Sequence, residues 1–209
     1  MKIITDKAKN GLTNPEFKKH LLNPVIKSEL SAKEIDELQT KMEIALDSYG
    51  GLGLSANQLG IDKRVCLIRV REHNLFLVNP IITERSQDGF LFFEGCLSIP
   101  KTLEIPLRTI RSTKVKVQTD NLDELTFEVN PDGDKEQVSD ETLLTVVVQH
   151  EIDHLDGITI RDRVYSTTVT KKASYGRNDK ILMKSPDNEF VEVKYKKAND
   201  YFLKGYEIV

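Results

Sequence analysis

Residues 145–157 read TVVVQHEIDHLDG, and the rest of the chain is organised around this stretch. If it is helical, His150 and His154 lie one turn apart on the same face, because residues four apart stack along an α-helix. Two imidazoles placed in this way can bind one metal ion, and Glu151 between them can handle protons at a water bound to that ion. The spacing therefore predicts a metal-binding helix.

This stretch has two other possible interpretations. A solvent-exposed helix could carry two histidines four residues apart by chance, but Val146–Val148 and Ile152 are too apolar for an exposed helix. The β-branched run Thr145–Val148 would also fit a strand. Only a helix brings both histidines to one ion, and Ser139, followed by two acidic residues, is a typical helix start. We therefore expect a helix that begins after Ser139 and ends at Gly157.

The composition indicates one large domain, or one domain with a small appendage. Of the 209 residues, 30 % are charged and 39 % hydrophobic, so we expect a soluble globular protein. A formal charge of -3 argues against a general nucleic-acid binder, and no sequence-specific nucleic-acid partner is expected. Two cysteines fit a reducing compartment. With neither an apolar signal region nor a membrane-length apolar run, the cytoplasm is the expected location, with no membrane partner.

Upstream of the histidine helix, the sequence predicts two more helices and a series of strands. Asn14, followed by Pro15, caps a short helix that ends at Leu22, and the capping box Ser31-Ala-Lys-Glu34 opens a longer helix that ends at Tyr49. Apolar runs predict strands at 64–70, 75–78, 81–83, 114–119 and 125–129. The predicted fold is therefore α+β, with antiparallel sheets packed around a central metal-binding helix that carries HExxH.

A catalytic divalent metal takes three protein ligands and keeps one position open, so the two histidines need a third ligand. Cys96 lies in the segment FFEGCLSIP, residues 92–100, beside a glycine and in no CxxC pair, which excludes a four-thiolate zinc site. Cys96 is therefore the candidate third ligand. The other cysteine, Cys66, lies within an apolar strand, and we expect it to be a buried, inert thiol.

A glycine-rich segment, GLGLSANQLG, follows the second helix at residues 51–60. Its glycines and small residues let a backbone approach a ligand closely, and Gln58 offers an amide donor and acceptor. Taken alone the segment is a weak indication, because glycine-rich turns after helices are common. It also lacks the Lys-Ser/Thr ending of a phosphate-binding loop.

Together these three segments resemble the peptide deformylase family. The family motifs GxGLAAxQ, EGCLS and QHExDHLxG match residues 51–58, 94–98 and 149–157, in the same order and with similar spacing. The resemblance covers about the first 165 residues. The chain departs from the family in three places. Ser55 stands where the family has alanine, a long acidic loop precedes Ser139, and the chain beyond about Lys171 has no match in the ordinary enzyme.

The resemblance implies that the chain removes the N-terminal formyl group from new polypeptides and releases formate. It implies one divalent metal, ferrous iron in the family, held by Cys96, His150 and His154. The ligand set alone would predict zinc. In this chemistry Glu151 accepts the proton of the attacking water and passes it to the leaving amine. The Gln58 amide and the Leu97 backbone N–H stabilise the oxyanion.

The resemblance also implies how an N-formylmethionyl peptide binds. Gly53 and Gly95 would let the substrate backbone lie as an extra strand. The residues three, four and seven positions before His150 share its helix face. These residues, Val147, Val146 and Leu143, would form an apolar pocket for the methionine side chain. Their apolar character is also explained in part by packing in the core.

We divide the chain into a deformylase-like catalytic domain, 1–170, and a small basic module of unassigned function, 171–209. The module is predicted to contain a hairpin, a short helix at 197–204 and a last strand at 206–209. Nine basic and six acidic residues give it a charge of +3, which leaves -6 for the remainder. A negatively charged partner, such as the RNA surface of the ribosome, would therefore suit it. A solvated module, or a site for another protein, is the alternative.

Two other functions stay open at this point. Thermolysin-type peptidases also carry HExxH but complete the site with a downstream carboxylate, and metzincins need a third histidine downstream. The remaining histidines, His20 and His73, both lie far upstream. A peptidase of another HExxH kind is therefore the nearest alternative. The second alternative is a deformylase that has lost its activity and serves as a ribosome-binding protein. The presence of all three candidate ligands, of Glu151 and of Gln58 argues against it.

Overall fold

The computed structural model describes residues 1–7, 13–130, 137–165, 178, 180–185, 190–198, 201 and 207–208. The chain divides into two compact units, Met1–Tyr165 and Ser166–Val209, and each is described by itself. In the part of the chain described, no helix is both long and apolar enough to cross a membrane.

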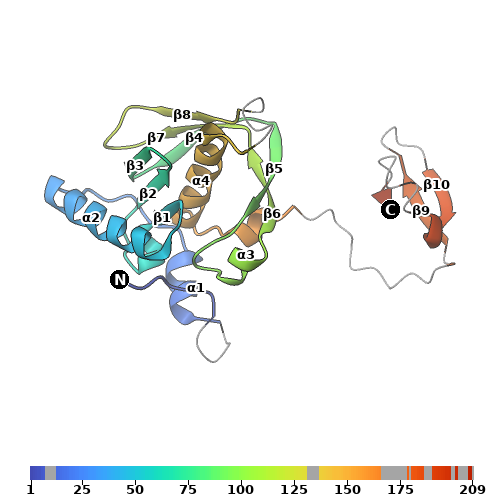
Figure 1. Ribbon diagram of the computed structural model, residues 1–209, viewed down its shortest axis with the longest axis horizontal. Helices are drawn as coiled ribbons and strands as arrows, with labels where there is room; N and C mark the ends of the chain where they lie inside the picture. Colours follow the sequence, from blue (N-terminus) through green and yellow to red (C-terminus); the bar gives the residue numbers. More distant parts are fainter. Residues whose placement is uncertain are drawn as a thin grey trace. The chain divides into compact units, whose positions relative to one another are not determined.

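The first unit is built around a central helix, α4 (Asp140–Leu155), with strands on several sides of it (Figure 1). Its described strands form three antiparallel sheets. In sheet order these are β1 (Gly53–Ser55), β2 (Val65–Val70) and β3 (His73–Val78); β4 (Ile81–Arg85), β7 (Lys114–Gln118) and β8 (Leu125–Glu128); and β5 (Gly89–Glu94) with β6 (Leu107–Ser112). The predicted α+β class, with antiparallel sheets around the histidine helix, is confirmed.

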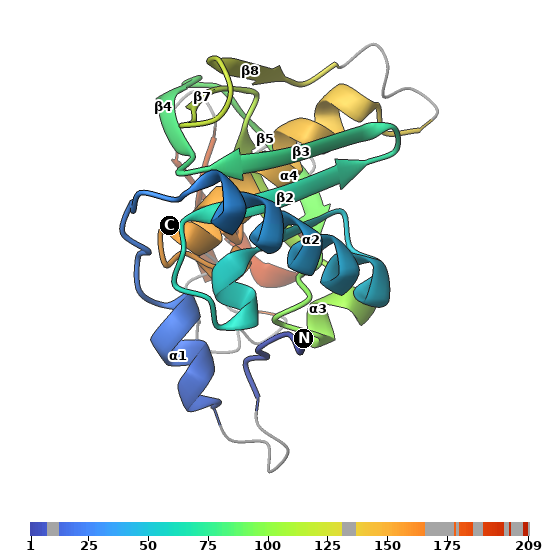
Figure 2. The same ribbon diagram turned by 90° about the vertical axis from the view of Figure 1, so that its left-hand side faces the viewer.

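The sheet β1-β2-β3 is buried on both faces. Helix α2 (Ala32–Tyr49) covers one face, where Met42 and Leu46 pack with Leu67 of β2. Helix α4 covers the other face, where Ile152 packs with Ile68. Figure 2 shows α2 and α4 on opposite sides of β2 and β3. Double coverage explains why β2 is a continuous apolar run instead of an alternating one.

The β-branched start of α4 is helical because the helix is buried on every side. Every residue from Leu144 to Leu155 is buried. A helix enclosed in this way is stabilised by packing more than by intrinsic propensity. Ser139 caps it by accepting a hydrogen bond from the Thr142 N–H at 3.2 Å, and two acidic residues occupy the first turn. The polar members of the buried stretch, which include both histidines, are thereby held inside the protein.

The other predicted helices are present. Asn14 caps α1 (Pro15–Leu21), and Ser31 and Glu34 form the expected capping box of α2, which ends at Gly50 in the left-handed conformation. Cys66 is fully buried in β2, as expected, and burial raises the pKa of its thiol. These local signals sufficed because caps and breakers act within a few residues of the chain.

The strands β5 and β6, and the short helix α3 (Lys101–Glu104) between them, were not predicted from the sequence. Apolar periodicity fails in this region, because Phe93 and Ile110 point to solvent while the inward residues of β6 are the polar Thr109 and Arg111. The inward face of β6 therefore carries polar side chains toward α4.

In the second unit, β9 (Lys180–Lys184) pairs antiparallel with β10 (Phe190–Lys194), and β11 (Glu207–Ile208) pairs with the other edge of β9. Ile181, Met183 and Val193 form a small core of their own with Ala198. Of the helix expected at 197–204, only residues 197, 198 and 201 are described, and the first of these ends a 3₁₀ turn, Tyr195–Lys197. The acidic loop expected before Ser139 lies outside the described residues at positions 131–136.

Candidate active site

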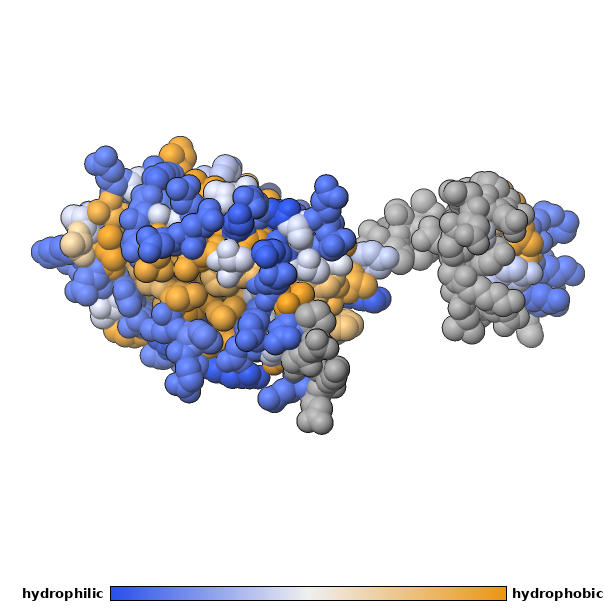
Figure 3. Space-filling view, turned by 90° about the horizontal axis from the view of Figure 1, so that it is seen from above, coloured by the Kyte–Doolittle hydropathy of each residue, from blue (hydrophilic) through white to orange (hydrophobic). Residues whose placement is uncertain are grey.

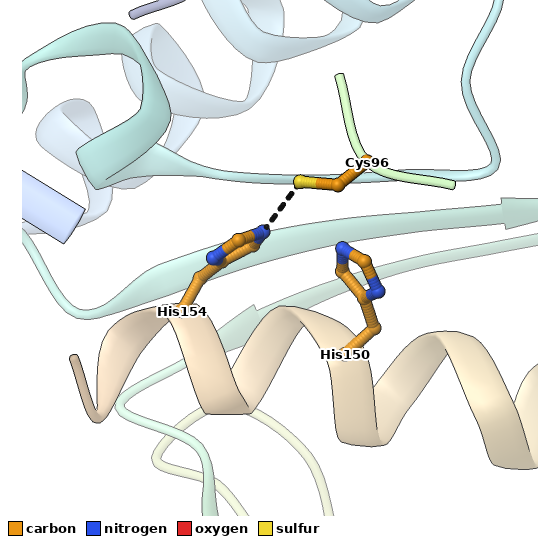
Figure 4. A group of neighbouring side chains, drawn as sticks. All are labelled: Cys96, His150 and His154. Carbon is orange, nitrogen blue, oxygen red and sulfur yellow. Dashed lines mark hydrogen bonds between the residues drawn. The ribbon is translucent and has the colours of Figure 1, made fainter. Parts of the chain in front are cut away.

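Three side chains with metal-ligating atoms converge at the centre of the first unit. The sulfur of Cys96 and ring nitrogens of His150 and His154 lie within 4.8 Å of one another, and all three residues are buried. Figure 4 shows both imidazoles rising from α4 toward the cysteine, which comes from the segment after β5. The nearest pair is Cys96 Sγ and His154 Nε2, which are 3.2 Å apart.

The chemistry of this donor set fits a divalent metal ion. His150 uses Nδ1 to contact the Glu94 carboxylate at 2.8 Å, which leaves its Nε2 for an ion. An imidazole that ligates a metal must be neutral. Burial lowers the pKa of His154 well below its usual value, whereas the contacts of His150 with Cys96 and Glu94 outweigh burial and raise its pKa. Binding of an ion would therefore displace a proton from His150. One thiolate and two neutral imidazoles form a set that suits zinc and other borderline divalent ions.

A buried ionic network holds the candidate ligand His150 in place. Glu94 accepts two hydrogen bonds from Arg111, at 2.6 and 2.8 Å, besides its contact with His150. Arg111 also donates to Asp153, which accepts a further pair of bonds from Arg163. Burial would raise the pKa of Glu94, but the bonds to His150 and Arg111 outweigh burial and hold that pKa well below its usual range. A carboxylate on the second ring nitrogen fixes both the tautomer and the orientation of a ligating histidine.

Gln58 reaches the site from the turn that follows β1. Its Oε1 accepts hydrogen bonds from the N–H and the hydroxyl of Ser55, and its Nε2 donates to Ser98 Oγ at 3.1 Å. The turn itself is tied to α4, because Asn57 Nδ2 donates to the carbonyl oxygen of His154 at 2.6 Å. The backbone N–H of Leu97 donates to no protein acceptor that the structure describes.

Glu151 lies beside the ligands, on the same helix. It is buried, and its Oε2 has no hydrogen-bond partner among the residues described. Burial raises the pKa of Glu151 to about 7, against the lowering effects of His150 and the Ser55 hydroxyl. A carboxyl group with a pKa near neutrality can both accept and release a proton at physiological pH.

A pocket of about 330 Å³ opens over these groups. Apart from the buried His154, every site residue expected from the sequence lines this pocket: Gly53, Gln58, Gly95, Cys96, Leu97, Leu143, Val146, Val147, His150 and Glu151. The pocket also has apolar residues that are exposed to solvent: Tyr49, Leu52, Phe93 and Leu103. On the face of the first unit shown in Figure 3, apolar side chains likewise gather between hydrophilic ones.

The family of the chain follows from comparison with known proteins. A family model described as polypeptide deformylase matches residues 18–170. The chain belongs to this family. As a deformylase it is a metal-dependent hydrolase that removes the N-terminal formyl group from nascent peptides.

Similar deformylases come from bacteria and from phages. The peptide deformylase of Natranaerobius thermophilus is 35% identical over 149 residues, which are 68% of this chain and 86% of the relative. That of Dictyoglomus thermophilum is 33% identical and covers 70% and 91% of the two chains. Among solved structures, the enzyme of Vibrio parahaemolyticus bacteriophage VP16T, in complex with actinonin, is 30% identical with a TM-score of 0.58. It covers 77% of this chain and 100% of its own.

Sequence reasoning missed the groups that support the candidate ligands. Glu94 and Asp153 lie inside the quoted motifs, each within two residues of a candidate ligand. Their negative charge at these positions was the available indication that they support a ligand. Arg111 had no local signal, because it lies 17 residues from Glu94 and 42 from Asp153 along the chain. Ser55 was recognised as a departure from the family motif, but the contact of its hydroxyl with Gln58 was not predicted.

The structure gives Gly53 a specific reason to be glycine. A Cβ on this residue would lie 2.6 Å from Glu151 Oε1 and 2.8 Å from Val147 Cγ1. We expect Gly53→Ala to displace the Glu151 carboxylate and to lower kcat for a formyl peptide by about a hundredfold, because an ångström of misplacement has that effect. Steady-state kinetics with metal analysis would measure it.

The control for this substitution is Gly89→Ala. There the nearest atoms belong to the exposed side chain of Ile110, at 3.1 Å, and can move away. Wild-type kcat in Gly53→Ala would show that the Glu151 carboxylate tolerates displacement. Loss of bound metal in that variant would point to damage beyond Glu151.

Proposed function

We propose that Cys96, His150 and His154 hold the divalent ion beside which the formyl group of the substrate is hydrolysed. When bound, such an ion supplies Lewis-acid polarisation and lowers the pKa of a water toward neutrality. Ferrous iron is the metal we propose, following the family that the sequence resembles. Zinc is the alternative, because the donor set suits it equally well.

Glu151 is the proton carrier in this proposal. It takes the proton of the attacking water as the new C–O bond forms on the formyl carbon. It then delivers that proton to the amine nitrogen as the C–N bond breaks, so that formate and a free amine leave. Its position in the pocket, its unpartnered Oε2 among the described residues and its raised pKa support this role.

Gln58 and Leu97 are the proposed oxyanion donors. Gln58 gives one of its two amide hydrogens to Ser98 and keeps the other available. The Leu97 N–H is unused within the described structure. Donors that are fixed before the reaction stabilise the charge that develops on the former carbonyl oxygen.

The substrate peptide is proposed to bind as an extended strand between β1 and β5. Each is an edge strand among those described, with a paired neighbour on one side only. Both contribute to the pocket, β1 through Gly53 and β5 through Phe92, Phe93 and Glu94. Exposed strand edges bind peptides through main-chain hydrogen bonds. The methionine side chain is assigned to the wall formed by Leu143, Val146 and Val147.

Gly95 is proposed to lie beside this added strand. A Cβ there would come within 2.9 Å of Leu103 Cδ2 and 3.0 Å of the Thr102 carbonyl oxygen, both in α3. The glycine therefore also permits the close packing of α3 against the cysteine segment.

The observation that carries the proposal is the convergence of three ligands, a buried carboxyl group and an amide donor on one pocket. The test is anaerobic hydrolysis of a formyl-methionyl peptide by the iron-loaded and zinc-loaded protein, with the unformylated peptide as control. We expect formate only from the formylated peptide, and faster turnover with iron. Cleavage of an internal bond in the unformylated peptide would instead indicate a peptidase.

The cytoplasm is the proposed location of the protein.

The C-terminal module, residues 171–209, is proposed to contact the ribosome. The charge of +3 on this segment, against -6 on the remainder, supports a negatively charged partner. Lys194, Lys196 and Lys197 lie at the end of β10 and in the turn after it, and all three are exposed. Exposed lysines close together along the chain suit contact with phosphates.

Replacing Lys194, Lys196 and Lys197 together by Glu is expected to weaken ribosome cosedimentation at low salt. The turnover of a short formyl peptide should not change, because these residues lie in the second unit. The matched control is Lys33→Glu with Lys41→Glu, two exposed positions on α2. Truncation after residue 170 should have the same effect as the triple replacement. Unchanged cosedimentation would overturn the ribosome contact, and collapse of short-peptide turnover would show that the module supports the catalytic unit.

A further inference from the structure

Ser55 departs from the family motif and lies in contact with Gln58, which lines the pocket. Its hydroxyl stands in place of one hydrogen of the alanine methyl group, and the residue as a whole is fully buried. Its Oγ lies 3.0 Å from Gln58 Oε1, and the Ser55 N–H donates to the same oxygen at 2.9 Å. When the single hydroxyl hydrogen is donated to Gln58, one residue fills both acceptor sites of the amide oxygen. The Glu151 carboxylate, whose pKa this hydroxyl lowers, is the competing acceptor for the same hydrogen.

These two bonds restrict the orientation of the Gln58 amide. With Oε1 turned to Ser55, Nε2 lies on the opposite side, where it donates to Ser98 Oγ at 3.1 Å. A flipped amide would place its NH₂ group against the Ser55 N–H, donor against donor, in a region without exposed surface. The backbone of Ser55 cannot adjust to that, because it is paired with Cys66 at the end of β1.

We propose that the Ser55 hydroxyl is a positioning group that acts on the reaction through Gln58. An alanine at this position would keep the backbone N–H and hence the amide orientation, but would leave Oε1 with one bond instead of two. The hydroxyl narrows the rotation of the amide and so holds the free N–H of Nε2 toward the pocket. This inference rests on the proposed role of Gln58 as an oxyanion donor.

The expected effect of Ser55→Ala is a fall in kcat of about five-fold, which corresponds to one neutral hydrogen bond. KM for a short formyl peptide should stay unchanged, because a better-aimed oxyanion donor acts mainly in the transition state. Folding is not at issue, since alanine is the residue that the family motif has at this position.

The decisive experiment is a double-mutant cycle with Gln58→Ala, using the metal-loaded full chain. Gln58→Ala alone should lower kcat by about a hundredfold. If Ser55 acts through Gln58, adding Ser55→Ala to that variant should change kcat by less than about two-fold. The control is Thr145→Val, which removes another buried hydroxyl whose bond runs to the Glu141 carbonyl oxygen. Its effect on kcat, whatever its size, should be the same in both backgrounds.

Three results would contradict the inference. A five-fold loss from Ser55→Ala in both backgrounds would show that the hydroxyl acts elsewhere, with the Glu151 carboxylate as the nearest candidate. No loss in Ser55→Ala, with the hundredfold loss in Gln58→Ala intact, would reject the role of Ser55 and leave the proposed function standing. Full activity in Gln58→Ala would remove the oxyanion role of Gln58, and the proposal for Ser55 with it.

Discussion

Glu151→Gln is expected to retain its metal and to lose between about a hundredfold and ten-thousandfold in kcat. Glutamine has the same shape as glutamate, so the packing against Gly53 is kept. It cannot accept the proton of the attacking water or return it to the amine, and proton transfer by a positioned side chain is worth this much in rate. The measurement is kcat for a formyl-methionyl peptide, with metal content determined on the same sample.

The control for this prediction is Glu141→Gln, an exposed glutamate in the first turn of the same helix. Its kcat should match that of the wild type, because it lies outside the pocket lining. If Glu151→Gln lost its metal, Glu151 would have to be counted among the ligands. If it kept wild-type turnover, another group would have to carry the proton.

The helices α1, α2 and α4, and the strands other than β1, β5 and β6, were predictable because their signals are local. Ser31 and Ser139 mark helix starts within one turn, and the runs of β2 and β7 show their burial in the sequence itself. The histidine pair was predictable for the same reason, since four residues along the chain fix the geometry of two ligands. Cys96 was predicted only as a candidate, because two histidines need a third ligand, and its distance to α4 depends on the fold.

The β5-β6 pair was not predictable, because here the active site overrides the usual pattern. Thr109 and Arg111 point inward to meet Glu94, while Leu91, Phe93 and Ile110 point outward. A strand with a polar interior face and apolar residues at its surface lacks the alternation that identifies a half-buried strand. The polar face exists because a buried ligand needs charged support. The residues hardest to assign from sequence were thus those that orient His150.

The candidate ligand outside α4, Cys96, is also held in place by buried contacts. Cys96 is held by backbone contacts: its N–H donates to Thr102 Oγ1 at 2.8 Å, and its carbonyl oxygen accepts from the Ile99 N–H at 2.9 Å. The thiol is therefore aimed at α4 independently of any ion. Such a preformed site binds a metal without first ordering its ligands, and most of that affinity should depend on the thiolate.

Cys96→Ala is accordingly expected to abolish both metal retention and turnover. Two neutral imidazoles remain, which is one ligand fewer than catalytic sites of this kind use. The loss of affinity should exceed the roughly 100-fold that removal of an outer-shell partner causes. Metal analysis after dialysis would measure it, and in the cobalt-substituted protein the thiolate-to-metal charge-transfer band should vanish. Cys66→Ala is the matched control, because it removes the other buried thiol, keeps all three ligands and should keep both metal and band. Full metal occupancy in Cys96→Ala would contradict the assignment of Cys96 as a ligand, and loss of the band in Cys66→Ala would transfer that role to Cys66.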